Sequence, residues 1–112
     1  MGMPKPGTPV RGSDTGRPIM AIFDLLGRKW LARIVWELRE TPMTFRELQG
    51  RCDNMSPTVL NQRLSELREV RVVEISPEGG YTLSPSGKAL LKSLGPLLAW
   101  SEKWAVELAH SK

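Results

Sequence analysis

The chain has 112 residues, of which 40% are hydrophobic and 25% are charged, and its formal net charge is +4. This length is enough for one domain with its own core but not for two. No apolar run approaches the ~18 residues of a membrane span, and the N-terminus has no apolar signal core. We therefore expect a cytoplasmic protein that neither enters a membrane nor is secreted.

The charge and the rare residue types exclude several kinds of site. A net charge of +4 and a pI near 9.6 permit a nucleic-acid partner without requiring one. The only cysteine, Cys52, and the only histidine, His110, cannot build a typical zinc site or a Cys–His catalytic pair. We interpret Cys52 as a small core side chain in a reducing compartment. The sequence thus predicts no catalytic residue, no metal and no cofactor.

The first half of the chain predicts an arm followed by two helices. Residues 1–16 are rich in proline and glycine, so we expect a flexible arm before a single domain over residues 17–110. Pro18 suits the first turn of a helix, and Gly27 suits its end. A second helix is predicted over residues 28–40, where apolar side chains recur at helical spacing.

Two further helix starts follow in the middle of the chain. Thr44 with Glu47 three residues later is the capping-box pattern and predicts a short helix. Ser56 as N-cap and Pro57 at the first position then begin a helix over about residues 56–70. The buried face of this helix is predicted from apolar spacing at i, i+4 and i+7. Its members are Leu60, Leu64 and Leu67.

The period of the pattern changes after this helix. The segments VVEIS (residues 72–76) and YTLS (residues 81–84), with PEGG between them, predict a small β-hairpin. Ser84 and Pro85 then begin a long closing helix, in which Pro96 predicts a kink. The apolar arc of this helix is too wide for a lone surface helix, and a symmetric dimer is the simplest partner.

The order of these elements predicts the fold class. A short helix, a tight turn and a capped helix form a helix-turn-helix, and the hairpin behind them is a wing. We therefore expect a mainly α protein with a small β-hairpin wing, a winged helix-turn-helix that dimerises through its terminal helices. The predicted dimer interface consists of Ile19, Ile22, Leu97, Trp100, Trp104 and Leu108.

The outer face of the helix over residues 56–70 predicts DNA binding. With its leucines inward, short neutral side chains project outward that can pair with base edges in a major groove. These residues are Thr58, Asn61, Gln62 and Ser65. Other residues are placed to hold the phosphate backbone, at the free N–H groups of the helix start or on flanking cations. They are Ser56, Arg46, Arg51 and Arg63.

Four motifs in order support this interpretation. DLLGRKW (residues 24–30), FRELQGRCDNMSPTVLNQRLSEL (45–67), YTLSPSGKALL (81–91) and Trp100 together resemble the HxlR-type winged helix-turn-helix regulators, relatives of the MarR regulators. The resemblance runs from about Arg17 to Trp104. It implies a homodimeric bacterial transcription regulator whose capped helix enters the major groove of a palindromic operator.

The sequence departs from that family at three places. Arg17-Pro18 stands where members usually carry Cys-Pro. The resemblance therefore does not imply that this chain senses oxidants or electrophiles through a thiol at that position. Arg71 replaces the usual glycine after the recognition helix, so either the turn differs or strain of about 1 kcal/mol is tolerated. The wing is short and carries Glu74 and Glu78, which leaves open whether it contacts DNA.

Two alternatives stay open from the sequence. A winged-helix module that binds protein fits the near-neutral region of residues 41–90, which holds six basic and six acidic residues. The four tryptophans are interpreted as core and dimer packing, while an aromatic effector pocket between the second and last helices is the other interpretation. The sequence identifies no small-molecule effector.

Overall fold

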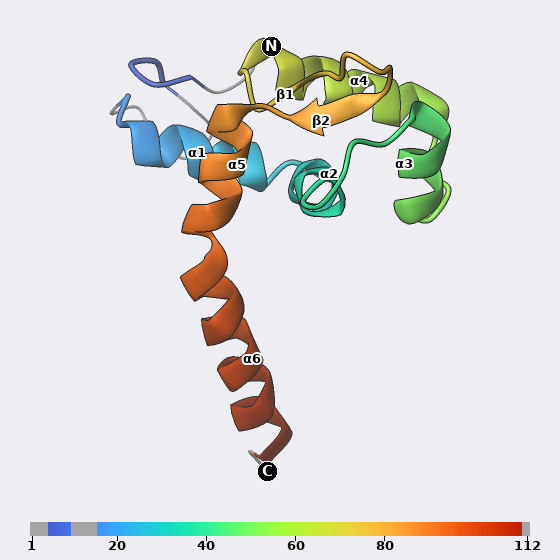
Figure 1. The fold of residues 1–112 in the computed structure, drawn as a ribbon. Helices are drawn as coiled ribbons and strands as arrows, with labels where there is room; N and C mark the ends of the chain where they lie inside the picture. The colour runs from blue at the N-terminus through green and yellow to red at the C-terminus, as the bar shows by residue number, and fades with distance from the viewer. Residues whose placement is uncertain (1–4, 10–15, 111–112) are drawn as a thin grey trace.

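The structure is a computed structural model. It describes residues 5–9 and 16–110 of the chain. Over these residues the chain forms six helices and one two-stranded antiparallel sheet (Figure 1). They are α1 (Pro18–Leu26), α2 (Leu31–Glu37), α3 (Phe45–Arg51), α4 (Pro57–Glu69), β1 (Val73–Ile75), β2 (Tyr81–Leu83), α5 (Pro85–Ser93) and α6 (Gly95–His110). The predicted mainly α fold with a β-hairpin wing is confirmed. Arg11 and most of the predicted arm lie outside the described residues.

The helix starts follow the capping residues in the sequence. The Thr44 hydroxyl accepts a hydrogen bond from the Glu47 N–H at 3.1 Å, and the Glu47 carboxylate accepts one from the Thr44 N–H at 2.9 Å. This pair closes the predicted capping box, and the bond from the Thr44 backbone lowers the pKa of Glu47. The Ser56 hydroxyl accepts from the Val59 N–H at the start of α4. The Ser84 hydroxyl accepts from the Gly87 N–H at 2.9 Å at the start of α5.

The core lies between the helices and under the hairpin. Leu60, Leu64 and Leu67 on α4 are at most 1% exposed, as the spacing predicted. They pack in one cluster with side chains from α2, α3 and both strands. Cys52 is also fully buried in this cluster, which confirms its interpretation as a core side chain. The burial fixes which side of α4 faces outward.

The second helix is shorter than predicted. It spans Leu31–Glu37 and does not fill residues 28–40, because Trp30 takes a left-handed conformation with φ of 75°. A left-handed residue cannot continue a right-handed α-helix, so residues 28–30 form a turn before α2. The Lys29 carbonyl of this turn accepts a hydrogen bond from Arg63 of α4.

The predicted long terminal helix is two helices. α5 ends at Ser93 and α6 begins at Gly95, so the expected kink at Pro96 is a break at Leu94. Pro96 lacks the N–H that a continuous helix would need, and the adjacent glycine disfavours helix further. The break allows α6 to leave the body at its own angle, and Figure 1 shows it projecting away from all other elements.

The turn after α4 keeps left-handed geometry although it carries no glycine. Arg71 has φ of 62°, its N–H donates to the Arg68 carbonyl at 3.1 Å, and the Val72 N–H donates to the Leu67 carbonyl at 2.9 Å. These two bonds form a Schellman motif, in which glycine is the preferred residue at the position of Arg71. The turn thus has the left-handed geometry that glycine usually provides, and the chain tolerates the backbone strain of an arginine at this position.

Replacing Arg71 with glycine should therefore raise the free energy of unfolding by about 1 kcal/mol, because the left-handed conformation then carries no steric cost. Urea unfolding measures the change. Arg68→Gly is the matched control, since that residue lies inside α4 and glycine there should cost about 1 kcal/mol. Loss of stability in Arg71→Gly would show that the arginine side chain, and not the backbone, stabilises this turn.

Candidate nucleic-acid interface

The outer face of α4 is a stripe of neutral polar side chains. Thr58, Asn61, Gln62 and Ser65 are all exposed, while the three leucines of the same helix are buried. Among the described residues, no side-chain hydrogen bond engages any of these four. Their amide and hydroxyl groups are therefore available to an external partner along about two turns of helix. We refer to these four residues as the polar stripe.

The turn between α3 and α4 depends on two left-handed residues. Asp53 and Asn54 have φ of 59° and 54°, a conformation that these two residue types tolerate better than most. The Gln49 side chain donates to the Met55 carbonyl at 2.9 Å, and the Asn54 N–H donates to the Gln49 carbonyl at 2.9 Å. These bonds join the end of α3 to the start of α4 and define the helix-turn-helix.

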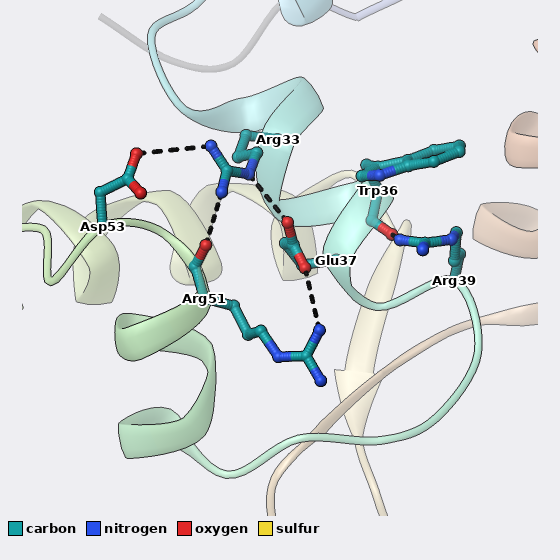
Figure 2. Close-up of polar contacts among 6 residues, drawn as sticks. All are labelled: Arg33, Trp36, Glu37, Arg39, Arg51 and Asp53. Carbon is teal, nitrogen blue, oxygen red and sulfur yellow. Dashed lines mark hydrogen bonds and ion pairs between the residues drawn. The ribbon is translucent and has the colours of Figure 1, made fainter. Parts of the chain in front are cut away.

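A cluster of charges holds this turn against α2 (Figure 2). The Arg33 guanidinium donates to Glu37 at 2.9 Å and to the Arg51 carbonyl at 2.6 Å, and it lies 3.5 Å from the Asp53 carboxylate. The hydrogen bond to Glu37 raises the pKa of Arg33. Glu37 also lies 3.8 Å from the Arg51 guanidinium. Helical periodicity does not predict this cluster, because its two halves, on α2 and at the end of α3, are far apart along the chain.

The three predicted backbone-binding arginines have different surroundings. Arg46 and Arg51 on α3 are exposed, although Arg51 lies near Glu37. Arg63 on α4 points inward: its side chain is only 19% exposed and is bonded to Glu66 and to the Lys29 carbonyl. Ser56 lies exposed at the N-cap of α4. The structure thus leaves Ser56, Arg46 and Arg51 accessible and ties Arg63 to the protein.

Comparison with known proteins identifies the family. A family profile described as HxlR-like helix-turn-helix matches residues 25–109, most of the chain. This chain belongs to the HxlR-like helix-turn-helix family. The resemblance expected from the four sequence motifs is confirmed.

The relatives of this HxlR-like protein are named as transcriptional regulators and not as enzymes. It is 36% identical to the uncharacterized regulator YvaP of Bacillus subtilis over 87 residues, which cover 72% of this chain and 81% of YvaP. It is 32% identical to the regulator YodB of the same organism over 88 residues, covering 73% of this chain and 79% of YodB.

Two solved structures have the same fold. The crystal structure of quinone-bound YodB superimposes with a TM-score of 0.70 at 30% identity, covering 76% of this chain and 96% of YodB. A protein from Enterococcus faecalis assigned to the MarR family of transcriptional regulators superimposes with a TM-score of 0.74 at 27% identity, covering 91% of this chain and 98% of that protein.

The wing of this HxlR-like protein is acidic at its tip. β1 and β2 pair in antiparallel register from Val73 opposite Leu83 to Ile75 opposite Tyr81. Glu74 and Glu78 are exposed on the hairpin. These two carboxylates add negative charge to the wing, and negative charge repels phosphate.

The last helix carries a large exposed apolar surface. No residue of α6 is buried, and Trp100 and Trp104 are 56% and 48% exposed with their rings stacked 5.4 Å apart. Among the other predicted interface residues, Leu97, Leu108 and Ile19 are exposed and Ile22 is half-buried. Three further exposed apolar residues lie on these helices outside the predicted interface. They are Phe23, Leu98 and Val106.

The tryptophans of α2 and α6 belong to different regions. Trp36 on α2 is partly exposed, with the Arg39 guanidinium 4.2 Å from the centre of its ring (Figure 2). It is α5 that packs against α2, while Trp100 and Trp104 lie on the projecting α6 (Figure 1). The described residues therefore form no aromatic pocket between α2 and α6 within one chain.

Cys52 is inaccessible in the folded protein. It is fully buried at the end of α3, and burial raises the pKa of its thiol. Because the thiolate is the reactive form, we expect the native protein to react with an aromatic disulfide reagent at least about a hundred times more slowly than the urea-unfolded chain. Absorbance of the released thiolate follows the reaction. Equal rates in the two states would mean that the helix-turn-helix opens readily around Cys52.

Two other kinds of site have no support in the described part of the chain. Its His, Cys, Asp and Glu residues form no group of three or more arranged to hold a metal ion. Among the same residues, no helix combines the length and apolar character required to cross a membrane.

Proposed function

We propose that this protein is a sequence-specific DNA-binding transcriptional regulator that acts as a homodimer on a palindromic operator. In this proposal α4 is the recognition helix and enters the major groove. The observation that carries the proposal is the polar stripe, because four exposed neutral donors and acceptors line one face of a helix that follows a helix-turn-helix turn. The regulators related to the chain support it.

The chemistry of the polar stripe suits base edges. The amides of Asn61 and Gln62 match the paired donor and acceptor of adenine, and the hydroxyls of Thr58 and Ser65 match several bases. We assign backbone phosphates to the accessible N-terminus of α4 at Ser56 and to the exposed cations Arg46 and Arg51 of the helix-turn-helix.

The homodimer is proposed from the exposed apolar surface of α6. A helix whose large apolar side chains are about half exposed needs a partner surface, and contiguous patches of this kind mark interaction sites. A second copy of the chain supplies an identical patch through a twofold axis, with α1 contributing Ile19 and Phe23. A twofold dimer would present two recognition helices to half-sites roughly 34 Å apart.

Gln62→Ala tests the reading face. We expect it to weaken binding to a selected operator by ~1–3 kcal/mol while leaving binding to random duplex nearly unchanged, because base contacts carry specificity and phosphate contacts do not. Fluorescence anisotropy with labelled duplexes measures both affinities. Thr41→Ala, a neutral exposed residue outside α4, is the matched control and should change neither. An equal loss on both duplexes would remove Gln62 from the reading face.

A protein-binding winged-helix module is the second candidate, favoured by the equal numbers of basic and acidic residues in residues 41–90. Salt separates the two functions. A DNA-binding dimer should show log K falling with log salt by about 0.9 for each phosphate neutralised. No measurable affinity for duplex DNA at low salt would favour the protein-binding function.

A further inference from the structure

Arg63 is held by the protein in a way that keeps it from reaching DNA. Its Nε donates to the Lys29 carbonyl at 3.0 Å, and its Nη1 donates to the Glu66 carboxylate at 2.7 Å. Two directions of the planar guanidinium are therefore used within the fold, and the side chain is 19% exposed. A phosphate contact by Arg63 would have to come from one of its remaining N–H groups, on a side chain that is mostly buried and directed toward the protein.

The bonds of Arg63 continue toward α1. Glu66 lies 3.8 Å from the Arg28 guanidinium, and Arg28 lies 3.8 Å from the Asp24 carboxylate on α1. Glu66 and Asp24 have side chains only 15% and 4% exposed. In a partly desolvated setting the Coulomb attraction within such pairs is stronger than between fully exposed ions. A continuous chain of charges thus joins α1, the turn at residues 28–30 and α4.

We infer that Arg63 is a positioning residue for the recognition helix and does not bind phosphate. Arg63 fixes the rotation of α4 against the turn that precedes α2, and Glu66 fixes the direction of the Arg63 guanidinium. The turn is held by its own backbone hydrogen bonds, since the Arg28 N–H donates to the Leu25 carbonyl at 3.2 Å and the Leu31 N–H donates to the Arg28 carbonyl at 3.1 Å. This inference rests on the proposed function of α4 and assigns a role to the residues of the DLLGRKW motif.

The position of Arg63 on α4 explains why its anchor would affect specificity. Arg63 follows Gln62 directly, so a rotation of the helix that frees Arg63 also turns the polar stripe. Base contacts need donors and acceptors in place within a few tenths of an ångström, whereas phosphate attraction tolerates larger displacements. Loss of the anchor should thus lower specific affinity while leaving non-specific affinity intact.

The experiment compares Arg63→Lys with Arg63→Ala. Lysine keeps the charge and can still bind a phosphate, but it cannot make the two directed bonds of the guanidinium. We expect both variants to bind a selected operator at least about tenfold more weakly, to bind random duplex like the wild type, and to keep its salt dependence. Arg46→Ala is the matched control, for which the slope of log K against log salt should fall by about 0.9.

A phosphate contact by Arg63 predicts the opposite pattern and would overturn the inference. In that case Arg63→Lys binds like the wild type, whereas Arg63→Ala loses affinity equally on both duplexes and its salt slope falls by about 0.9. Circular dichroism at the assay temperature establishes that each variant is folded. Glu66→Gln provides a milder variant, expected to shift specific affinity in the same direction because glutamine keeps the acceptor for Arg63 without its charge.

Hydrogen exchange tests the same anchor without DNA. In the free protein, Arg63→Lys should raise the exchange rates of backbone amides in residues 28–31 and α4 at least about threefold, because the bond to the Lys29 carbonyl is lost. Unchanged exchange would overturn the inference even if DNA binding were absent. A wild type without any preference for a selected duplex would defeat the proposed function instead, so the two failures are distinguishable.

Discussion

A chain carrying Trp100→Ala and Trp104→Ala should be a monomer at concentrations where the wild type is a dimer. The two rings are the largest exposed apolar groups on α6, and each substitution counts twice across a twofold interface. About half of the ~200 Å² of each ring is still exposed and can be buried on association, which at about 25 cal/mol per Å² gives about 2–3 kcal/mol of association free energy per ring. Light scattering should report the mass of a single chain for the variant, close to the 12.5 kDa of the unsubstituted monomer.

The same variant should bind a palindromic operator at least about a hundredfold more weakly, because a monomer can engage only one half-site at a time. Lys103→Ala, on the same helix between the two tryptophans, is the matched control and should leave the dimer intact. An unchanged mass for the double variant would place the dimer interface elsewhere.

Leu64→Ala is the substitution with the largest expected effect on folding. Leu64 is 1% exposed on the inner side of α4 and packs within the single core cluster. Removing its isobutyl group leaves a cavity, and the free energy of unfolding should fall by ~2–5 kcal/mol. A small domain has only ~5–15 kcal/mol in total, so the variant should unfold at far lower urea concentration.

Ser65→Ala is the control for Leu64→Ala. Ser65 is the next residue on the same helix but lies exposed on the polar stripe, so its stability should change by less than about 0.5 kcal/mol. This pair separates the two faces of α4, because Leu64 belongs to the core and Ser65 is proposed to contact DNA. A loss above about 2 kcal/mol for Ser65→Ala would mean that the outer face is also packed.

The elements that could be predicted from the sequence are those determined locally. The Thr44 and Glu47 side chains each accept from the other's backbone N–H within one turn, and the Ser56 hydroxyl accepts from the Val59 N–H at the start of α4. The polar stripe follows from the same logic, because the burial of three leucines on one face decides which residues face outward. Local capping and helical periodicity therefore predicted the helix-turn-helix and its exposed face.

The features that could not be predicted depend on distant parts of the chain. The Arg63 guanidinium donates to a carbonyl 34 residues away, and the Arg33 guanidinium donates to one 18 residues away. From periodicity alone, Arg63 looked like a flanking cation free to bind phosphate. The short α2 is a similar case, since the left-handed Trp30 lies inside a stretch whose apolar spacing is helical throughout. Tertiary contacts override local pattern at these positions.

The measurement that tests the central claim most directly is a selection from random duplexes, performed in parallel with the wild type and with Asn61→Ala. The account predicts that the wild type enriches an inverted repeat with half-sites about 10–10.5 base pairs apart. It also predicts that Asn61→Ala relaxes the preference at one symmetric pair of positions while keeping the rest of the repeat. Enrichment of the same sequence with the same preferences by both proteins would contradict the placement of the outer face of α4 in the major groove.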